Sequence, residues 1–157
     1  MSNITKEDKK NAYLYCKFRD EQFALYSEYA KSHGMLMNTL LVVNVLFYDD
    51  FYAKGGMTQR EICQRTFQSK QTVNLIIKNL LSDGYVTVTE VPENKRTKIV
   101  RMTEAGKAYC EKVVRHVTWA EDTAMSMFSP EEQQLIDLSR TFTQNLTKLI
   151  HQERSES

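Results

Sequence analysis

The chain has 157 residues, 41% of them hydrophobic and 26% charged, with a formal net charge of +1, which is ordinary for a globular protein. No stretch reaches the roughly 18 uninterrupted apolar residues of a membrane-spanning helix, and no apolar leader follows the charged N-terminus, so we expect a cytoplasmic protein without membrane contact. Cys16, Cys63 and Cys110 lie far apart without Cys-x-x-Cys spacing, which argues against a zinc ribbon and against a disulfide framework.

The first third of the chain predicts two helices. Residues 5–31 contain many charged and aromatic residues but no proline or glycine, and the turn Lys31-Ser32-His33-Gly34 follows them. Residues 38–53 carry apolar side chains on nearly every face, which predicts a helix buried at the centre of the fold. Gly55-Gly56 is expected to end this second helix.

The next segment predicts two helices joined by a tight turn. Thr58 precedes Glu61 by three residues, which is the pattern of a capping box and predicts a short helix. The chain is expected to break at Gln68, and Ser69 is a good N-cap for a helix over Lys70–Ser82. The side chains expected to face the core are Ile62, Phe67, Val73, Ile76, Ile77, Leu80 and Leu81. The outer face of the second helix is expected to be entirely polar, with Lys70, Gln71, Thr72, Asn74, Lys78 and Asn79.

A basic hairpin follows these two helices. Residues 85–91 and 98–102 alternate apolar and polar side chains around the turn Pro92-Glu93-Asn94-Lys95-Arg96. Together the helices and the hairpin predict a winged helix-turn-helix, whose second helix enters a DNA groove. The charge distribution supports this, because residues 58–104 hold eight Lys and Arg against five Asp and Glu, whereas residues 105–157 hold six against eight.

The C-terminal third predicts two amphipathic helices. Thr103-Glu104-Ala105-Gly106 leads into a helix expected to run to about residue 128, and Ser129, Pro130 and Glu132 form a strong start signal for the last helix. Its apolar residues recur at three- and four-residue intervals: Leu135, Leu138, Phe142, Leu146, Leu149 and Ile150. Such long stripes need a partner, and a second copy of the chain would place two recognition helices side by side on a twofold DNA site.

Five motifs follow one another along the chain: Met57-Thr58-Gln59-Arg60-Glu61-Ile62, Ser69-Lys70-Gln71-Thr72-Val73, Leu80-Leu81-Ser82-Asp83-Gly84-Tyr85-Val86, Pro92-Glu93-Asn94-Lys95-Arg96-Thr97-Lys98 and Met102-Thr103-Glu104-Ala105-Gly106. In this order, with helices before and after them, they resemble the MarR (multiple antibiotic resistance regulator) family of winged-helix transcription factors over essentially the whole chain. The resemblance implies a mainly α fold of about six helices with a small β-wing, in a dimeric repressor or activator.

The resemblance also implies a division of the single domain, residues 1–157, into two lobes. Residues 37–103 would form the winged helix-turn-helix lobe that binds DNA, and residues 1–36 together with 104–157 would form a helical dimerisation lobe. Members of the family often release DNA when a small, frequently phenolic, ligand binds between the lobes or when a cysteine is oxidised.

The residues expected to contact DNA fall into two groups. Gln71, Thr72 and Asn74 occupy the first turns of the second helix, where amides can bond adenine and the threonine methyl can touch thymine. Phosphate contacts, which position the protein without reading the sequence, are assigned to Ser69, Lys70 and Lys78.

The wing departs from the family pattern, which commonly reads Asp-Arg-Arg where this chain has Asn94-Lys95-Arg96. Asn94 lacks the charge that would pair with an arginine, so we expect a less rigid wing. Arg96 at the hairpin tip is then expected to enter the minor groove and Lys95 to contact a phosphate.

Aromatic residues are concentrated near the N-terminus, where ten of the sixteen precede residue 53. Most are expected in the core or at a dimer contact. Because tyrosine hydroxyls beside an apolar central helix can line a pocket for an amphipathic molecule, a small aromatic effector is a candidate ligand. The candidate lining residues are Tyr15, Tyr26, Phe47 and Phe51.

These patterns favour a homodimeric, sequence-specific DNA-binding transcriptional regulator, a ligand-relieved repressor on a pseudo-palindromic operator. An enzyme is disfavoured because no nucleophile–base pair, metal cluster or phosphate loop is visible, and neither cofactor nor metal is expected. A winged-helix protein-interaction module stays open because the net charge is near zero. A redox-responsive regulator is the other alternative, although Phe23-Ala24-Leu25-Tyr26 is preceded by Gln22 and not by the cysteine of peroxide-sensing relatives.

Overall fold

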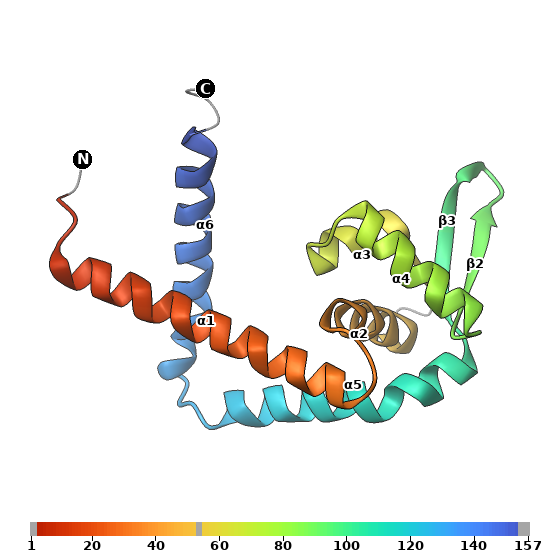
Figure 1. Ribbon diagram of the computed structural model, residues 1–157, viewed down its shortest axis with the longest axis horizontal. Coiled ribbons are helices and arrows are strands. Elements are labelled where there is room, and N and C mark those ends of the chain that lie inside the picture. The colour runs from red at the N-terminus through yellow and green to blue at the C-terminus, as the bar shows by residue number, and fades with distance from the viewer. Residues whose placement is uncertain (1–2, 53–54, 154–157) are drawn as a thin grey trace. The chain divides into compact units, whose positions relative to one another are not determined.

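A computed structural model describes residues 3–52 and 55–153, with the side chains of residues 50–52 and 153 left out of the description. Its elements are α1 (Lys6–Ser32), α2 (Met37–Tyr52), β1 (Met57–Thr58), α3 (Gln59–Thr66), α4 (Lys70–Ser82), β2 (Val86–Val91), β3 (Asn94–Met102), α5 (Glu104–Ser126), the 3-10 helix η1 (Glu132–Gln134) and α6 (Leu135–Glu153). The predicted fold class is confirmed: the described part is mainly helical, with six α-helices and one small antiparallel sheet (Figure 1).

The chain divides into two compact units, Met1–Arg115 and His116–Ser157. In the first unit α1 begins with a capping box: the Asp8 backbone N–H donates to Thr5 Oγ1 and the Thr5 N–H donates to Asp8 Oδ2 at 2.8 Å. The Thr5 hydroxyl and the Thr5 backbone N–H both donate to the Asp8 carboxylate, and these two hydrogen bonds lower the pKa of Asp8. At the other end of α1, Ala30 is fully buried and the Tyr29 hydroxyl donates to the Val113 carbonyl at 2.9 Å. The C-terminal end of α1 is therefore fastened to α5.

The core of the first unit is built around α2, as the sequence predicts. Leu40, Val42, Val43 and Leu46 are 0–3% exposed, and α2 contacts α1, α3, α4 and β3. A helix that is apolar on most faces is stable only where other elements cover it on several sides. The helix-turn-helix and the sheet are therefore assembled on α2.

The predicted helices over the helix-turn-helix are confirmed, but two of the expected core residues are exposed. Phe67 is 96% exposed, because the chain leaves α3 there in the left-handed conformation, with φ of 54°, and the side chain no longer follows the apolar face of the helix. Leu81 is 47% exposed because it lies at the edge of the buried stripe, about 100° around the helix from Leu80.

The sheet has the order β1-β3-β2, and all pairs are antiparallel. Val88 pairs with Val100, and Val91 pairs with Asn94 after an irregularity between Glu90 and Val91. The hairpin turn is therefore the two residues between Val91 and Asn94, shorter than the predicted five. Lys95 and Arg96 consequently lie at the start of β3 and not at the hairpin tip.

The junction between the sheet and α5 is tightly packed. The Thr103 Oγ1 hydroxyl donates to the Gly84 carbonyl at 2.7 Å and accepts from the Gly106 N–H at 3.0 Å. A Cβ atom at Gly106 would lie 2.1 Å from the Tyr85 carbonyl oxygen, so only glycine permits this approach. The first turn of α5 is thus held directly against the turn that joins α4 to β2.

The second unit contains the end of α5, η1 and α6. The predicted helix start is present as a reciprocal cap, in which the Ser129 N–H donates to Glu132 Oε2 at 2.8 Å and the Glu132 N–H donates to Ser129 Oγ at 3.2 Å. The first turn after this cap is a 3-10 helix, and the α-helix begins at Leu135. A search of the described residues finds no helix with the length and hydropathy of a membrane span.

Candidate nucleic-acid interface

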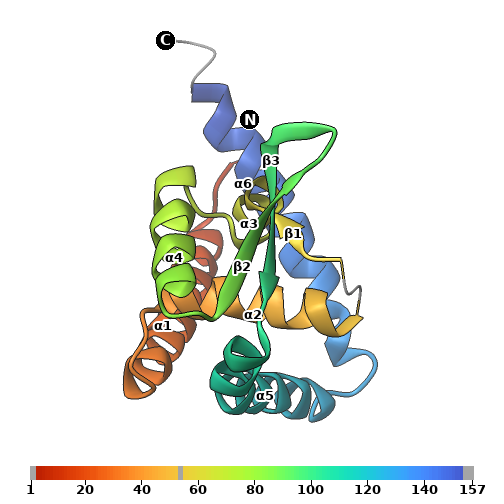
Figure 2. The ribbon, with the colours of Figure 1, turned by 90° about the vertical axis from the view of Figure 1, so that its right-hand side faces the viewer.

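The first turn of α4 and the hairpin turn between β2 and β3 lie at the same end of the first unit, away from α5, in both views (Figure 1, Figure 2). This arrangement follows from the chain path, because α4 runs away from that end and β2 returns to it. The two segments that the sequence assigns to DNA therefore face the same side of the unit.

The outward face of α4 carries the residues predicted to contact bases. Val73, Ile76, Ile77 and Leu80 are buried on the opposite face, at 0–7% exposed. The exposed residues of α4 include Lys70, Gln71, Asn74, Lys78 and Asn79, whereas Thr72 is half-buried. Burial of one face thus leaves a continuous outer surface that can enter a groove.

One prediction about this face is wrong, because it is not entirely polar. Leu75 is 60% exposed and belongs to the same stripe as Gln71, Asn74 and Lys78, at spacings of i, i+3, i+4 and i+7. The sequence contained a signal for it: Leu75 falls outside the buried stripe and four residues after Gln71.

The N-terminus of α4 is capped by a side chain predicted to contact phosphate. Ser69 Oγ accepts from the Thr72 backbone N–H at 3.1 Å and lies 2.9 Å from Thr72 Oγ1. The Thr72 hydroxyl therefore takes part in the cap. The remaining backbone N–H groups of the first turn and Lys70 make this end of the helix favourable for an anion such as a phosphate.

A second residue that the sequence analysis missed is Gln59, the first residue of α3. Its Nε2 donates to Asn74 Oδ1 at 3.3 Å. Because the Asn74 amide oxygen accepts this bond, its NH₂ group is the part left to donate to an acceptor on a base edge. Gln59 thereby orients a predicted base contact from a neighbouring helix.

The wing has a local brace that partly replaces the missing aspartate. Asn94 Oδ1 accepts from the Arg96 backbone N–H at 3.1 Å, and Arg101 Nη1 donates to Thr89 Oγ1 at 3.1 Å across the hairpin. Both Lys95 and Arg96 are exposed. The amide of Asn94 therefore fixes the backbone just before the basic residues, although it carries no charge.

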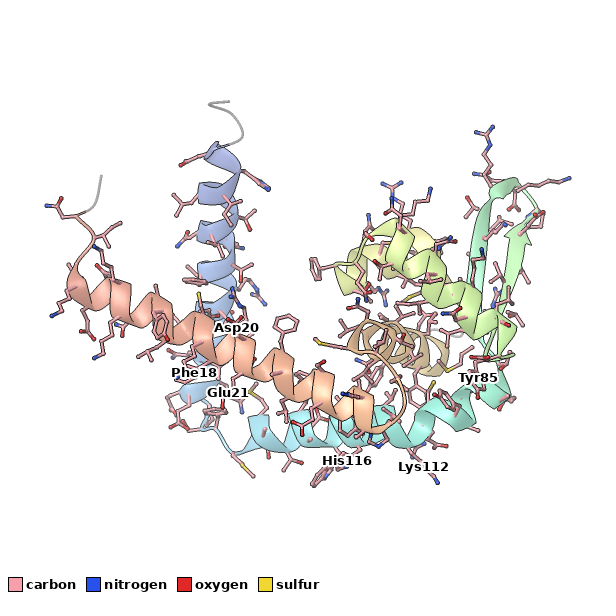
Figure 3. All side chains as sticks on the ribbon, in the orientation of Figure 1. Phe18, Asp20, Glu21, Tyr85, Lys112 and His116 are labelled. Carbon is pink, nitrogen blue, oxygen red and sulfur yellow. The ribbon has the colours of Figure 1, made fainter. Side chains whose placement is uncertain are left out.

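The predicted effector residues are not gathered in one described cavity. Tyr15 on α1 is 40% exposed, while Tyr26 on α1 and Phe47 on α2 are half-buried, and Phe51 lies outside the residues whose side chains are described. Phe47 contacts Tyr48 edge-on, with ring centroids 6.1 Å apart. An open hollow of about 550 Å³ on α1 has other lining residues, among them Phe18 and Glu21 (Figure 3).

The three cysteines are free thiols in different settings. Cys110 is buried, and this burial raises the pKa of its thiol to about 11, so the thiol stays protonated and unreactive at neutral pH. Cys16 and Cys63 are half-buried. Among the described residues, no three His, Cys, Asp or Glu side chains are grouped so that they could hold a metal ion.

A helix-turn-helix with a two-stranded wing and an exposed outer face on its second helix defines a winged helix-turn-helix fold. The sequence model of the MarR family matches residues 51–97, which include α3, α4, β2 and the start of β3. The chain is 22% identical to the HTH-type transcriptional regulator SarZ of Staphylococcus epidermidis over 143 residues, which are 90% of this chain and 93% of SarZ.

Solved structures share the fold. AbsC, a MarR family transcriptional regulator from Streptomyces coelicolor, superposes with a TM-score of 0.75 at 16% identity, covering 94% of this chain and 99% of AbsC. MepR of S. aureus in complex with DNA has a TM-score of 0.68 at 19% identity, with 88% and 97% covered. PcaV of Streptomyces coelicolor with its natural ligand has a TM-score of 0.66 at 16% identity, with 92% and 98% covered.

The family match over residues 51–97, the regulators among its relatives and the shared fold agree with the resemblance to MarR-family transcriptional regulators that the motifs indicate. The curated relatives are HTH-type transcriptional regulators.

Proposed function

We propose that this chain is a homodimeric repressor that binds a pseudo-palindromic operator through α4 and the wing and leaves it when a small aromatic effector binds. The observation that carries the proposal is the exposed face of α4, which lies at the same end of the unit as the basic wing (Figure 2). The complex of MepR with DNA supports it, because that protein shares this fold. A repressor of this kind acts on DNA in the cytoplasm.

Each DNA-facing residue has a role that follows from its chemistry. Gln71 and Asn74 offer amides to base edges, and the Thr72 methyl group lies beside them on the first turns of α4. Ser69, Lys70, Lys78 and Lys95 neutralise or bond phosphates, which positions α4 in the major groove. Arg96, braced by Asn94, enters the adjacent minor groove.

The dimer is proposed from apolar side chains that a single chain leaves exposed. On α6 Leu138 and Leu149 are 67% and 64% exposed, and on α1 Phe18 and Leu25 are 56% and 65% exposed. Surfaces of this kind are typical of subunit contacts. We therefore assign residues 1–36 and 104–157 to dimerisation and residues 37–103 to DNA binding.

The effector site is proposed near α1 and α2. Asn44 Oδ1 and Asp49 Oδ2 on α2 are buried without a hydrogen-bond partner among the described residues. A phenolic hydroxyl can donate to such an oxygen while its ring packs on Phe47, which lies on the same helix. An effector bound there would favour dimers whose two α4 helices are spaced wrongly for the operator. PcaV, which shares the fold, is solved with its natural ligand.

The proposal is tested by selecting bound sequences from random duplex DNA and measuring affinity against salt concentration. We expect a twofold motif with half-sites about 34–36 Å apart. Because a dimer carries two copies of Arg96, Arg96→Ala should weaken binding to all sequences and reduce the log–log salt slope by about two, whereas the control Arg19→Ala on α1 should change neither. A dimer that binds no duplex at low ionic strength would instead favour a protein-interaction module.

A further inference from the structure

We propose that Leu75 is a specificity-determining residue that contacts the 5-methyl group of a thymine in each half-site of the operator. The proposal rests on the proposed DNA-binding function of α4. Leu75 is 60% exposed and is the only strongly apolar side chain in the outward stripe that also contains Gln71, Asn74 and Lys78. The core-facing stripe of α4 is complete without it, since Val73, Ile76, Ile77 and Leu80 are all buried.

The placement of Leu75, and not its exposure alone, carries the argument. Single exposed leucines are common on protein surfaces. On this stripe, however, the side chain would face base edges whenever Gln71 and Asn74 do, because residues at i, i+3 and i+4 share one helix face. When α4 lies in the major groove, Leu75 would therefore contact the edge of a base.

The major groove offers one apolar group to such a side chain. Each base pair presents hydrogen-bond donors and acceptors there, and only thymine adds a methyl group. Leucine cannot donate or accept, so contact with a polar base edge would remove water from that edge without replacing its hydrogen bonds. The chemistry of Leu75 therefore fits the 5-methyl group and disfavours the cytosine edge at the same position.

The neighbouring side chains define where this thymine lies. Helical side chains lean toward the N-terminus, so Leu75 lies over the turn that contains Gln71, four residues earlier. Gln71 can bond an adenine in a bidentate way, and Gln59 holds the amide of Asn74, the residue before Leu75. The contacted thymine is expected beside the base pair that Gln71 bonds.

The test removes only the methyl group from the DNA. Each thymine of the selected operator is replaced in turn by deoxyuridine, which keeps the same base pairing, and affinity is measured for the full-length protein. With the wild-type chain we expect a loss of about fourfold at one thymine in each half-site, the value for removing one buried methyl group. Leu75→Ala should bind the unmodified operator more weakly and show no loss at that thymine.

Two further variants serve as controls. One tests whether removing any exposed leucine of α4 has the same effect, and the other tests whether another apolar side chain can replace Leu75. Leu81→Ala removes another exposed leucine of α4, 47% exposed and outside the stripe, and should keep the wild-type loss. Leu75→Met keeps an apolar side chain of similar volume and should retain most of the loss of affinity on deoxyuridine substitution. The inference is overturned if no thymine shows a loss with the wild-type chain, or if Leu75→Ala shows the same loss. If the chain still binds the operator in either of these cases, only the role of Leu75 is overturned and the proposed DNA-binding function stands. If the wild-type chain binds no duplex, both the role of Leu75 and the proposed function are overturned.

Discussion

Two helices of this chain carry apolar stripes of similar periodicity but differ in what covers them. In α4 the stripe of Val73, Ile76, Ile77 and Leu80 is buried by the same chain, whereas in α6 Leu138 and Leu149 are more than 60% exposed. A stripe covered from within stabilises the fold of one subunit, and a stripe left exposed requires another surface. The winged helix-turn-helix thus has its own core, and the comparison separates residues needed for folding from residues available for assembly.

The largest effect on stability is expected from truncating a buried side chain of α2. Leu46 on α2 is 1% exposed, so Leu46→Ala should lower the free energy of unfolding by about 2–5 kcal/mol, through lost burial and the cavity left behind. Urea denaturation followed by circular dichroism measures this change. The control Leu36→Ala, at a site 76% exposed, should stay within about 0.5 kcal/mol. Equal losses at the two sites would remove the distinction between covered and exposed leucines.

The exposed stripe of α6 can be broken with a charge. Leu149→Glu should convert the proposed dimer to a monomer and lower operator affinity on the order of a hundredfold, because two half-sites would then be bound independently. Sedimentation equilibrium and band-shift titration measure the two effects. Lys148→Glu changes the neighbouring, exposed residue and should leave the dimer intact. A Leu149→Glu protein that stays dimeric would show that α6 is not the dimer contact.

The junction between the sheet and α5 joins the buried core of the winged helix-turn-helix to the helix that continues into the second unit. A substitution at this junction tests whether the close packing there is needed for stability and for operator binding. Gly106→Ala would place a methyl group 2.1 Å from the Tyr85 carbonyl oxygen, so we expect a loss of about 1–3 kcal/mol in stability and weaker operator binding. Gly34→Ala is the matched control, since it meets no atom within 4 Å and strains only its own backbone, at φ of 72°. Its operator affinity should match the wild type. Equal effects at both sites would contradict a role for the close approach.

The smallest effect is expected at the cap of α3. Hydrogen bonds from Thr58 lower the pKa of Glu61 in the folded state. The pair therefore stabilises the folded protein fully at pH values above the pKa of the carboxyl in the unfolded chain. This stabilisation is lost as the pH falls through the lower pKa of the folded state. Thr58→Ala should lower stability by about 1 kcal/mol at pH 7 and flatten its dependence on pH below 5. Urea denaturation at several pH values measures both.

Thr5→Ala provides the comparison for this cap. It removes the same kind of box from α1, whose first turns are exposed, so its effect on global unfolding should be smaller than that of Thr58→Ala. An equal or larger effect at Thr5 would indicate that the N-terminal half of α1 folds together with the core.

Most of the fold could be predicted because its signals are local. The caps at Thr58, Ser69 and Ser129 act within three residues, and all three form the hydrogen bonds that their spacing predicts. The buried stripe of α4 was likewise visible as a helical period. The hairpin was predicted as an element, but its turn was not, because strand pairing across Val91 and Asn94 decided how far β3 extends.

By itself, the sequence determined the order of the helices, the presence of the hairpin and the buried stripe of α4, because caps, periodicity and turn residues depend on neighbours along the chain. Only the tertiary structure decided that Phe67 is exposed, that Gln59 holds Asn74, and that Gly106 lies against Tyr85. Each of these outcomes depends on how the chain turns between helices or on contacts between separate elements, so no local pattern encodes it.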